Sequence, residues 1–339
     1  MTALAWSPDE KLLVSTAHSF HEPNKPNEDW TVRLWDVASG AQLQRFPLLY
    51  AEQPAFRPDG RVVLCLAQGQ IHCWDVFSGR PGPGPSSKDL MAFAYSPDGR
   101  WLATAHTGGT ILVREQETER EILRFDAGPA GVYKLVWSID GKTLISANVD
   151  LTALIWDLTP PGWRNTHDLS GEGLERAWSD LQSSDAVRAY RAMWSLAAAR
   201  DDAVALIRER LRSSSGNEKA ERIRRLVTDL DHDQFAKREA ASKELSKLGR
   251  EAEPALLEAL ANRPSAEVSD RAKALLEGLA SRPLCATPEQ LLGSRAVCVL
   301  ERIATAKARE TLQMLSAHTP ATRIAPEARA ALLRLSHKT

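Results

Sequence analysis

Short apolar runs separated by polar turns fill the first 160 residues, whereas the later residues place apolar side chains at helical spacing. Runs at 11–16, 61–66, 101–105 and 143–146 have the length of β-strands, which usually hold about three to ten residues. Gly and Asp in the turns between them supply the backbone conformations with positive φ that tight turns require. The pattern predicts a β-rich N-terminal half and an α-helical C-terminal half.

Two short motifs recur in phase along the N-terminal half. A turn motif, close to Ser-Pro-Asp-Gly, occupies 7–10, 57–60, 96–99 and 138–141, and a strand-end motif, close to Leu-Trp-Asp, occupies 34–36, 73–75, 113–115 and 155–157. Successive strand-end motifs lie 39, 40 and 42 residues apart, which is the spacing of propeller blades built from four strands. The motifs predict four blades, at about 1–46, 47–87, 88–126 and 127–160.

Residues 1–160 resemble the WD40 family, most closely at 29–36 and 150–157, which match the consensus of its third strand. The resemblance implies a structural hydrogen-bonded network in each blade. This network would join an Asp before the third strand, a Trp at the end of that strand, a Ser or Thr on the second strand and a His in the preceding loop. The candidate motif residues are Asp29, Trp35, Asp36, Trp74, Asp75, Asp150, Trp156 and Asp157.

The network implied by this resemblance is incomplete. Gln68 and Gly108 stand where blades two and three should carry the Asp. Arg114 replaces the Trp of blade three, and Pro129 takes the His position of blade four.

Blade one carries an insertion between its two motifs. The interval from Asp9 to Asp36 is 27 residues, against 16 or 17 in the other blades, which places the extra residues at about 19–28. By the resemblance, this loop lies on the face that usually meets partners. It is either a binding epitope or a solvent loop, since long surface insertions cost little free energy. The candidate contact residues are Phe20, His21, Glu22 and Lys25.

Four blades without a closing strand leave an open arc with apolar, unpaired flanks. Met1 stands directly before an innermost strand, and Pro160 and Pro161 interrupt any strand after blade four. Three explanations stay open. In the first, further blades are encoded upstream and the chain is a C-terminal fragment of a larger protein. In the second, another chain completes the ring. In the third, the open or four-bladed form is itself stable.

For the C-terminal half, the sequence predicts a linker at 161–169 and an α-helical domain at 170–339. Residues 231–260 resemble a helical hairpin of the HEAT type, with Gly249 as a C-cap and Pro254 in the first turn of the second helix. The first helix of this hairpin is expected to bury Phe235, Ala240, Ala241, Leu245 and Leu248. The fold class is therefore a β + α multidomain protein, in which a partial WD40-type β-propeller precedes an all-α domain of HEAT-like repeats.

Composition excludes several classes of protein. The formal net charge of −1 divides into −5 for residues 1–160 and +4 for the remainder, which is too little to indicate a polyanionic partner. The four cysteines lack the spacing of a zinc site, and no apolar run reaches the roughly 18 residues that span a membrane. No catalytic or phosphate-binding motif is complete, so we expect no enzyme activity, cofactor or metal.

These observations favour a non-catalytic scaffold or adaptor for protein–protein interaction, located in the cytoplasm. The sequence does not identify the protein partners, and one option is self-association that completes the propeller. Neither a membrane nor nucleic acid is the expected partner. As a whole, the chain resembles largely uncharacterised bacterial WD40 proteins. The alternatives are a nucleic-acid-binding helical-repeat protein, motivated by the +4 half, and the regulatory end of a signalling kinase encoded upstream.

Overall fold

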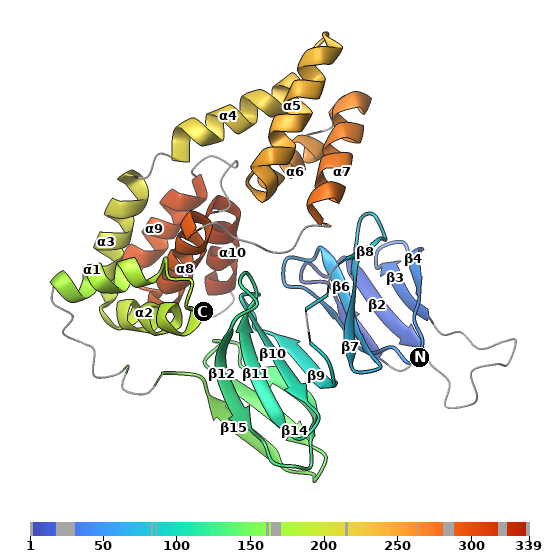
Figure 1. The fold of residues 1–339 in the computed structure, drawn as a ribbon, viewed down its shortest axis with the longest axis vertical. Helices are drawn as coiled ribbons and strands as arrows, with labels where there is room; N and C mark the ends of the chain where they lie inside the picture. Colours follow the sequence, from blue (N-terminus) through green and yellow to red (C-terminus); the bar gives the residue numbers. More distant parts are fainter. Residues whose placement is uncertain are drawn as a thin grey trace, which may run out of the picture. The chain divides into compact units, whose positions relative to one another are not determined.

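A computed structural model describes residues 3–17, 31–82, 84–85, 87–160, 163, 171–213, 216–262, 264–280, 288–317 and 324–336 (Figure 1). The chain folds into two compact units, Met1–Thr159 and Pro160–Thr339. In the described residues, the first unit contains strands and the second contains helices.

The N-terminal unit is a series of antiparallel sheets, each with its strands in chain order. Blade one contains β1 (Ala3–Trp6), β2 (Leu12–Ala17), β3 (Thr31–Asp36) and β4 (Gln42–Pro47), and blade two contains β5 (Glu52–Phe56), β6 (Val62–Ala67), β7 (Gln70–Asp75) and β8 (Pro81–Gly82). Blade three contains β9 (Leu90–Tyr95), β10 (Trp101–His106), β11 (Thr110–Glu115) and β12 (Glu121–Asp126), and blade four contains β13 (Val132–Trp137), β14 (Thr143–Asn148) and β15 (Ala153–Asp157). Among the described residues, the fourth blade thus has three strands.

The turn motif forms the hairpin between the first two strands of each blade. The Ser7 hydroxyl donates to Asp9 Oδ1 at 2.7 Å and accepts from the backbone N–H of Leu12 at 2.8 Å. Blades three and four repeat both contacts, and blade two replaces the hydroxyl with the Arg57 guanidinium, which binds Asp59. Because each turn is closed by its own side chains, the blade spacing is visible in the sequence.

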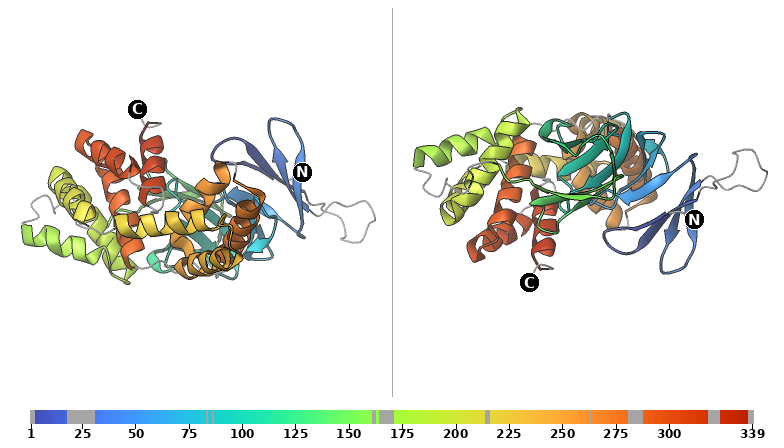
Figure 2. Two further views of the ribbon diagram at one scale, coloured as in Figure 1. Left: turned by 90° about the horizontal axis from the view of Figure 1, so that it is seen from above. Right: turned by 90° about the horizontal axis from the view of Figure 1, so that it is seen from below.

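Blades one and two pack through their innermost strands, β1 on β5, as do blades three and four, β9 on β13, whereas β6 contacts β9 between blades two and three. Figure 2 shows the strands of this unit, coloured from blue to green, in two further views. The core between blades one and two combines Val14, Val32 and Leu34 with Val63 and other side chains of blade two. A closed ring is not seen among the described sheets, so the series has two ends.

The helices of the C-terminal unit form two groups that each pack internally. One group is α1 (Gly171–Asp180), α2 (Ala186–Ala198), α3 (Arg200–Ser213), α8 (Pro288–Ile303), α9 (Ala306–Ala317) and α10 (Ile324–Ser336). The other is α4 (Gly216–Asp229), α5 (Phe235–Leu248), α6 (Glu253–Ala261) and α7 (Ala266–Ala280), whose shared core includes Ile223, Leu245 and Leu256. No helix in the described part of the chain is both long and apolar enough to cross a bilayer.

The hairpin expected at 231–260 is present as α5 and α6, but part of its expected core was wrong. Gly249, whose φ of 64° suits glycine, is the C-cap of α5, and Pro254 lies in the first turn of α6. Ala241 and Leu245 are buried as expected, whereas Ala240 is exposed and Phe235 is 63% exposed. Phe235 is the first residue of α5, and the guanidinium groups of Arg238 and Arg271 cover its ring at 5.6 and 5.8 Å.

We predict that Leu245→Ala destabilises the α4–α7 group by about 2–5 kcal/mol, because it leaves a cavity in a core where Leu245 is 1% exposed. Hydrogen exchange of residues 216–280, followed by mass spectrometry, measures the protection of the backbone amides in this group. Leu333→Ala is the matched control, since Leu333 is 63% exposed on α10. Equal protection of residues 216–280 in both variants would contradict the proposed core.

Candidate functional site

The motif tryptophans connect the third strand of a blade to its second strand. Trp35 donates from Nε1 to Ser15 Oγ at 2.9 Å, and Trp156 donates from Nε1 to Ser146 Oγ at 3.1 Å. In blade two, the strand register puts Cys65 where the other two blades have this serine. The Trp–Ser part of the expected network is therefore formed in blades one and four, and Asp29 lies outside the described residues.

The motif acids close turns within their own blades. Asp36 Oδ1 accepts from the Ser39 N–H at 2.8 Å and from the Ser39 hydroxyl at 2.5 Å. Asp75 binds Ser78, Asp157 binds Thr159 and Asp150 binds Thr152 in the same two ways. Hydrogen bonds from Ser39 hold the pKa of Asp36 below its ordinary value, as those from Thr152 do for Asp150. These acids thus act as local turn caps.

The residues proposed for the partner loop, Phe20, His21, Glu22 and Lys25, lie outside the described residues. Their role stays a prediction. Within the described part of the chain, no group of three or more His, Cys, Asp or Glu side chains is placed to hold a metal ion.

One face of each blade meets the blade that follows, and we call it the trailing face. At its centre, the second strand carries Val14, Leu64, Ala103 and Ile145 in blades one to four, by the shared strand register. The first three are at most 1% exposed, whereas Ile145 is 37% exposed. On the third strand, Leu34, Cys73 and Val113 are at most 5% exposed, whereas their counterpart Ile155 is 73% exposed. The trailing face of blade four is therefore uncovered.

Val136, Ile145 and Ile155 form a row of cross-strand neighbours on this uncovered face. Val136 is 49% exposed. A sheet face that meets solvent normally carries polar side chains, so an exposed apolar row of this kind makes this face a candidate contact surface.

The opposite face of each blade, here called the leading face, meets the preceding blade. Its central row is Phe56, Val63 and Trp74 in blade two, at 8%, 0% and 7% exposure. The same row in blade one is Trp6, Leu13 and Trp35. Trp6 is 57% exposed, and the neighbouring Leu4 is 47% exposed. The leading face of blade one is thus the second uncovered surface.

Two aromatic contacts show how a covered leading face is filled. The Phe46 ring of blade one stacks on Trp74 of blade two at 4.9 Å, and Phe125 of blade three lies 5.0 Å from Trp156 of blade four. Trp137 of blade four also donates from Nε1 to the Ala94 carbonyl of blade three at 3.0 Å. The fourth strand of one blade therefore contacts the third strand of the next, and the first strands of blades three and four contact each other.

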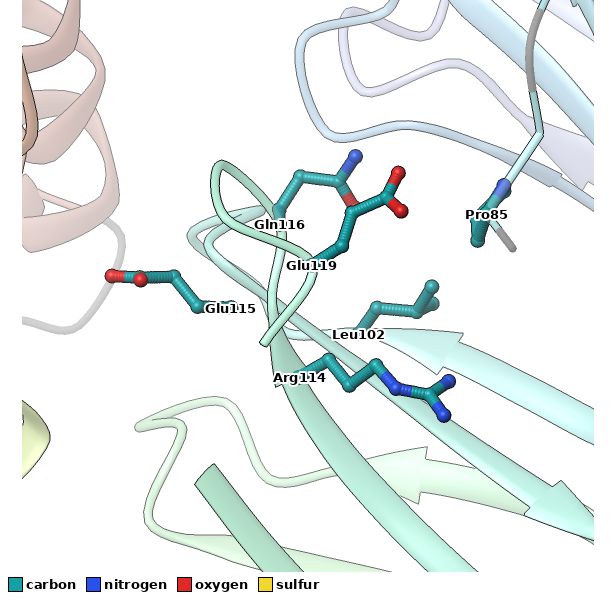
Figure 3. A pocket seen from close by; sticks show the side chains of 6 residues that line it. All are labelled: Pro85, Leu102, Arg114, Glu115, Gln116 and Glu119. Atoms are coloured by element: carbon teal, nitrogen blue, oxygen red, sulfur yellow. The ribbon is translucent and has the colours of Figure 1, made fainter. Parts of the chain in front are cut away.

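The boundary between blades two and three lacks this aromatic pair. Arg114 stands in the Trp position and donates to Ser87 Oγ, and β8 is only two residues long. The boundary contains a cavity of about 30 Å³, lined by Pro85, Leu102, Arg114, Glu115, Gln116 and Glu119 (Figure 3). This volume holds about one or two water molecules, far below the roughly 300 Å³ of a small-ligand site.

Sequence reasoning anticipated apolar flanks but named none of Trp6, Leu13, Val136, Ile145 and Ile155 as site residues. The available signal was the phase of the turn motif. Aligning the four turns would have shown that these side chains occupy positions that are buried in the inner blades.

A sequence profile of the family "WD domain, G-beta repeat" matches residues 1–36, 82–114 and 120–157. The N-terminal unit therefore contains WD40 repeats. The profile leaves out most of blade two, although β5–β8 form one sheet in the same order as the matched blades.

The chain is also similar to proteins named WD repeat-containing protein 1. It is 32% identical to the Gallus gallus protein over 94 residues, which are 27% of this chain and 15% of the relative. It is 33% identical to the Xenopus tropicalis protein over 102 residues, or 29% of this chain and 17% of the relative. With the Rattus norvegicus protein it shares 28% identity over 122 residues, or 34% of this chain and 20% of the relative. The chain thus spans about a fifth or less of these curated relatives.

We predict that acid destabilises the N-terminal unit through its turn-capping carboxylates. The folded pKa of Asp36 lies below its ordinary value of 3.8, so its contribution is present above about pH 4 and is lost as pH falls through the folded pKa. The urea midpoint, followed by tryptophan fluorescence, should decrease between pH 6 and pH 3. Asp36→Asn should lower the midpoint at pH 6 and reduce its dependence on pH. If the urea midpoint of Asp36→Asn depended on pH in the same way as that of the unmodified chain, this role of Asp36 would be contradicted.

Proposed function

We propose that this protein is a non-catalytic scaffold for protein–protein interaction, and that the uncovered leading and trailing faces are its binding surfaces. WD repeats typically mediate protein interactions, which supports the class of function. The observation that carries the proposal is the contrast in burial at equivalent positions. Leu34 is 0% exposed where a blade follows, and Ile155 is 73% exposed where none does.

The chemistry of the two faces suits a protein partner. Burying a large aliphatic or aromatic side chain contributes about 1.5–3 kcal/mol, and tryptophan is enriched among the residues that dominate binding energy. Each face presents three such side chains in one row. The turns of the same blade hold the strands that carry this row. A preformed apolar row loses little conformational entropy on binding.

The proposal extends to the rest of the chain. We take α5 and α6 as a HEAT-like hairpin, residues 161–169 as a linker, and the loop at 19–28 as a further contact. Cys65, Cys73 and Cys298 are buried free thiols, which supports a reducing compartment such as a bacterial cytoplasm. Burial raises the pKa of Cys73 to about 12, so this thiol is unreactive.

Nucleic-acid binding has no comparable support. Arg222 on α4 pairs with Glu244 at 2.9 Å, and Arg225 pairs with Glu221 at 3.5 Å. Arg222 and Arg225 therefore lie in a surface of mixed charge, whereas a polyanion requires concentrated positive charge.

We predict that Trp6→Glu and Ile155→Glu each weaken the binding of proteins to these faces tenfold or more. The reason is that each change removes an apolar contact and introduces a charge that binding would desolvate. Tagged chains would be used for affinity capture from cells that express the protein, with bound proteins, including untagged copies of the chain, quantified by mass spectrometry. Leu333→Glu is the control, since Leu333 is exposed on the helical unit. Capture unchanged by both face variants would overturn the proposal.

A further inference from the structure

The two uncovered faces are complementary to each other. Every blade contact in the N-terminal unit places the trailing face of one blade on the leading face of the next. Blade four presents an uncovered trailing face, and blade one presents an uncovered leading face. The two ends of the series therefore have the two halves of a contact that the unit already makes internally.

We infer that a second copy of this chain covers these faces, with blade one of each copy packed on blade four of the other. This inference rests on the proposed function, because it identifies the partner of the same surfaces. It requires no new type of interaction, since the contact repeats the one between blades three and four.

The internal contacts identify which residues would meet. Trp6 occupies in blade one the place that Trp137 has in blade four, directly before the serine of the turn motif. Val136 occupies in blade four the place that Ala94 has in blade three. Because Trp137 donates from Nε1 to the Ala94 carbonyl at 3.0 Å, Trp6 of one copy would donate to the Val136 carbonyl of the other.

The same comparison indicates that the contact between copies is weaker than the internal ones. Blades one and three each place a phenylalanine from their fourth strand on the next tryptophan, as Phe46 and Phe125 do. The described part of blade four ends with β15 and offers no counterpart. An aromatic pair stabilises a contact beyond the area that it buries, so the contact between copies lacks this contribution and dilution should separate the copies.

The contact joins two different faces, so each copy can engage a partner at both ends. Two copies related by a twofold axis would use all four faces and bring eight blades together, which is within the range of about four to eight blades in propellers. Three copies would bring twelve, outside that range. We therefore expect a dimer.

Analytical ultracentrifugation of the full chain should show a mass of two chains at tens of micromolar and dissociation on dilution. Trp6→Glu and Val136→Glu should each give a monomer, with far-UV circular dichroism confirming that the variants fold. Leu333→Glu should remain a dimer. Dimers that persist in both face variants would overturn the inference.

A cross-linking experiment tests the pairing of different faces. Leu4→Cys lies on the leading face beside Trp6, and Lys134→Cys lies on the trailing face beside Val136. Both are placed in a Cys285→Ser background, because the other three cysteines, Cys65, Cys73 and Cys298, are buried. A bifunctional maleimide should join the two variants when they are mixed, and neither variant to itself.

Cross-linking of either single variant to itself would overturn the inference, because it would place like faces together. A chain that stays monomeric over the whole concentration range would also overturn it, and would leave another protein, or chain outside these 339 residues, as the occupant. In that case, capture of a different protein that Trp6→Glu abolishes would still uphold the proposed function.

Discussion

Packing of one apolar sheet face on another is the interaction on which the N-terminal unit depends. A four-stranded blade is apolar on both faces, so it needs a neighbour on each side to remove its side chains from water. Blades two and three have two neighbours, and their central residues, such as Val63 and Val113, are at most 1% exposed. Blades one and four have one neighbour each, so one face of each leaves apolar side chains, such as Trp6 and Ile155, exposed to water.

Hydrogen bonds within the blade set the shape of those faces. The turn-motif aspartate closes the first hairpin together with a serine, or with Arg57 in blade two, and the strand-end acid closes the turn that follows the third strand. Trp35 and Trp156 then tie the third strand to the second through a serine hydroxyl. As a result, hydrogen bonds within the blade hold the strands that carry the large side chains, and the same rows recur from blade to blade.

Much of this order could be predicted from the sequence because its causes are local. Turn motif and strand-end motif lie within one blade, so spacing alone placed the strands, and the C-cap at Gly249 was visible for the same reason. The surroundings of Phe235 were not predictable in this way, because they depend on Arg271, which lies on another helix and contacts the exposed ring. The uncovered faces required the register between strands, which determines that Val136, Ile145 and Ile155 share one row.

The repeated leading and trailing faces also bear on how such a unit can change over evolution. If a segment of one blade length, about 40 residues, were duplicated or excised between two turn motifs, the new neighbours would still present one face of each kind. Each blade brings its own turn caps, so the hairpins on either side of the junction would keep their hydrogen bonds. The unit could therefore vary by whole blades while each boundary still pairs one trailing face with one leading face.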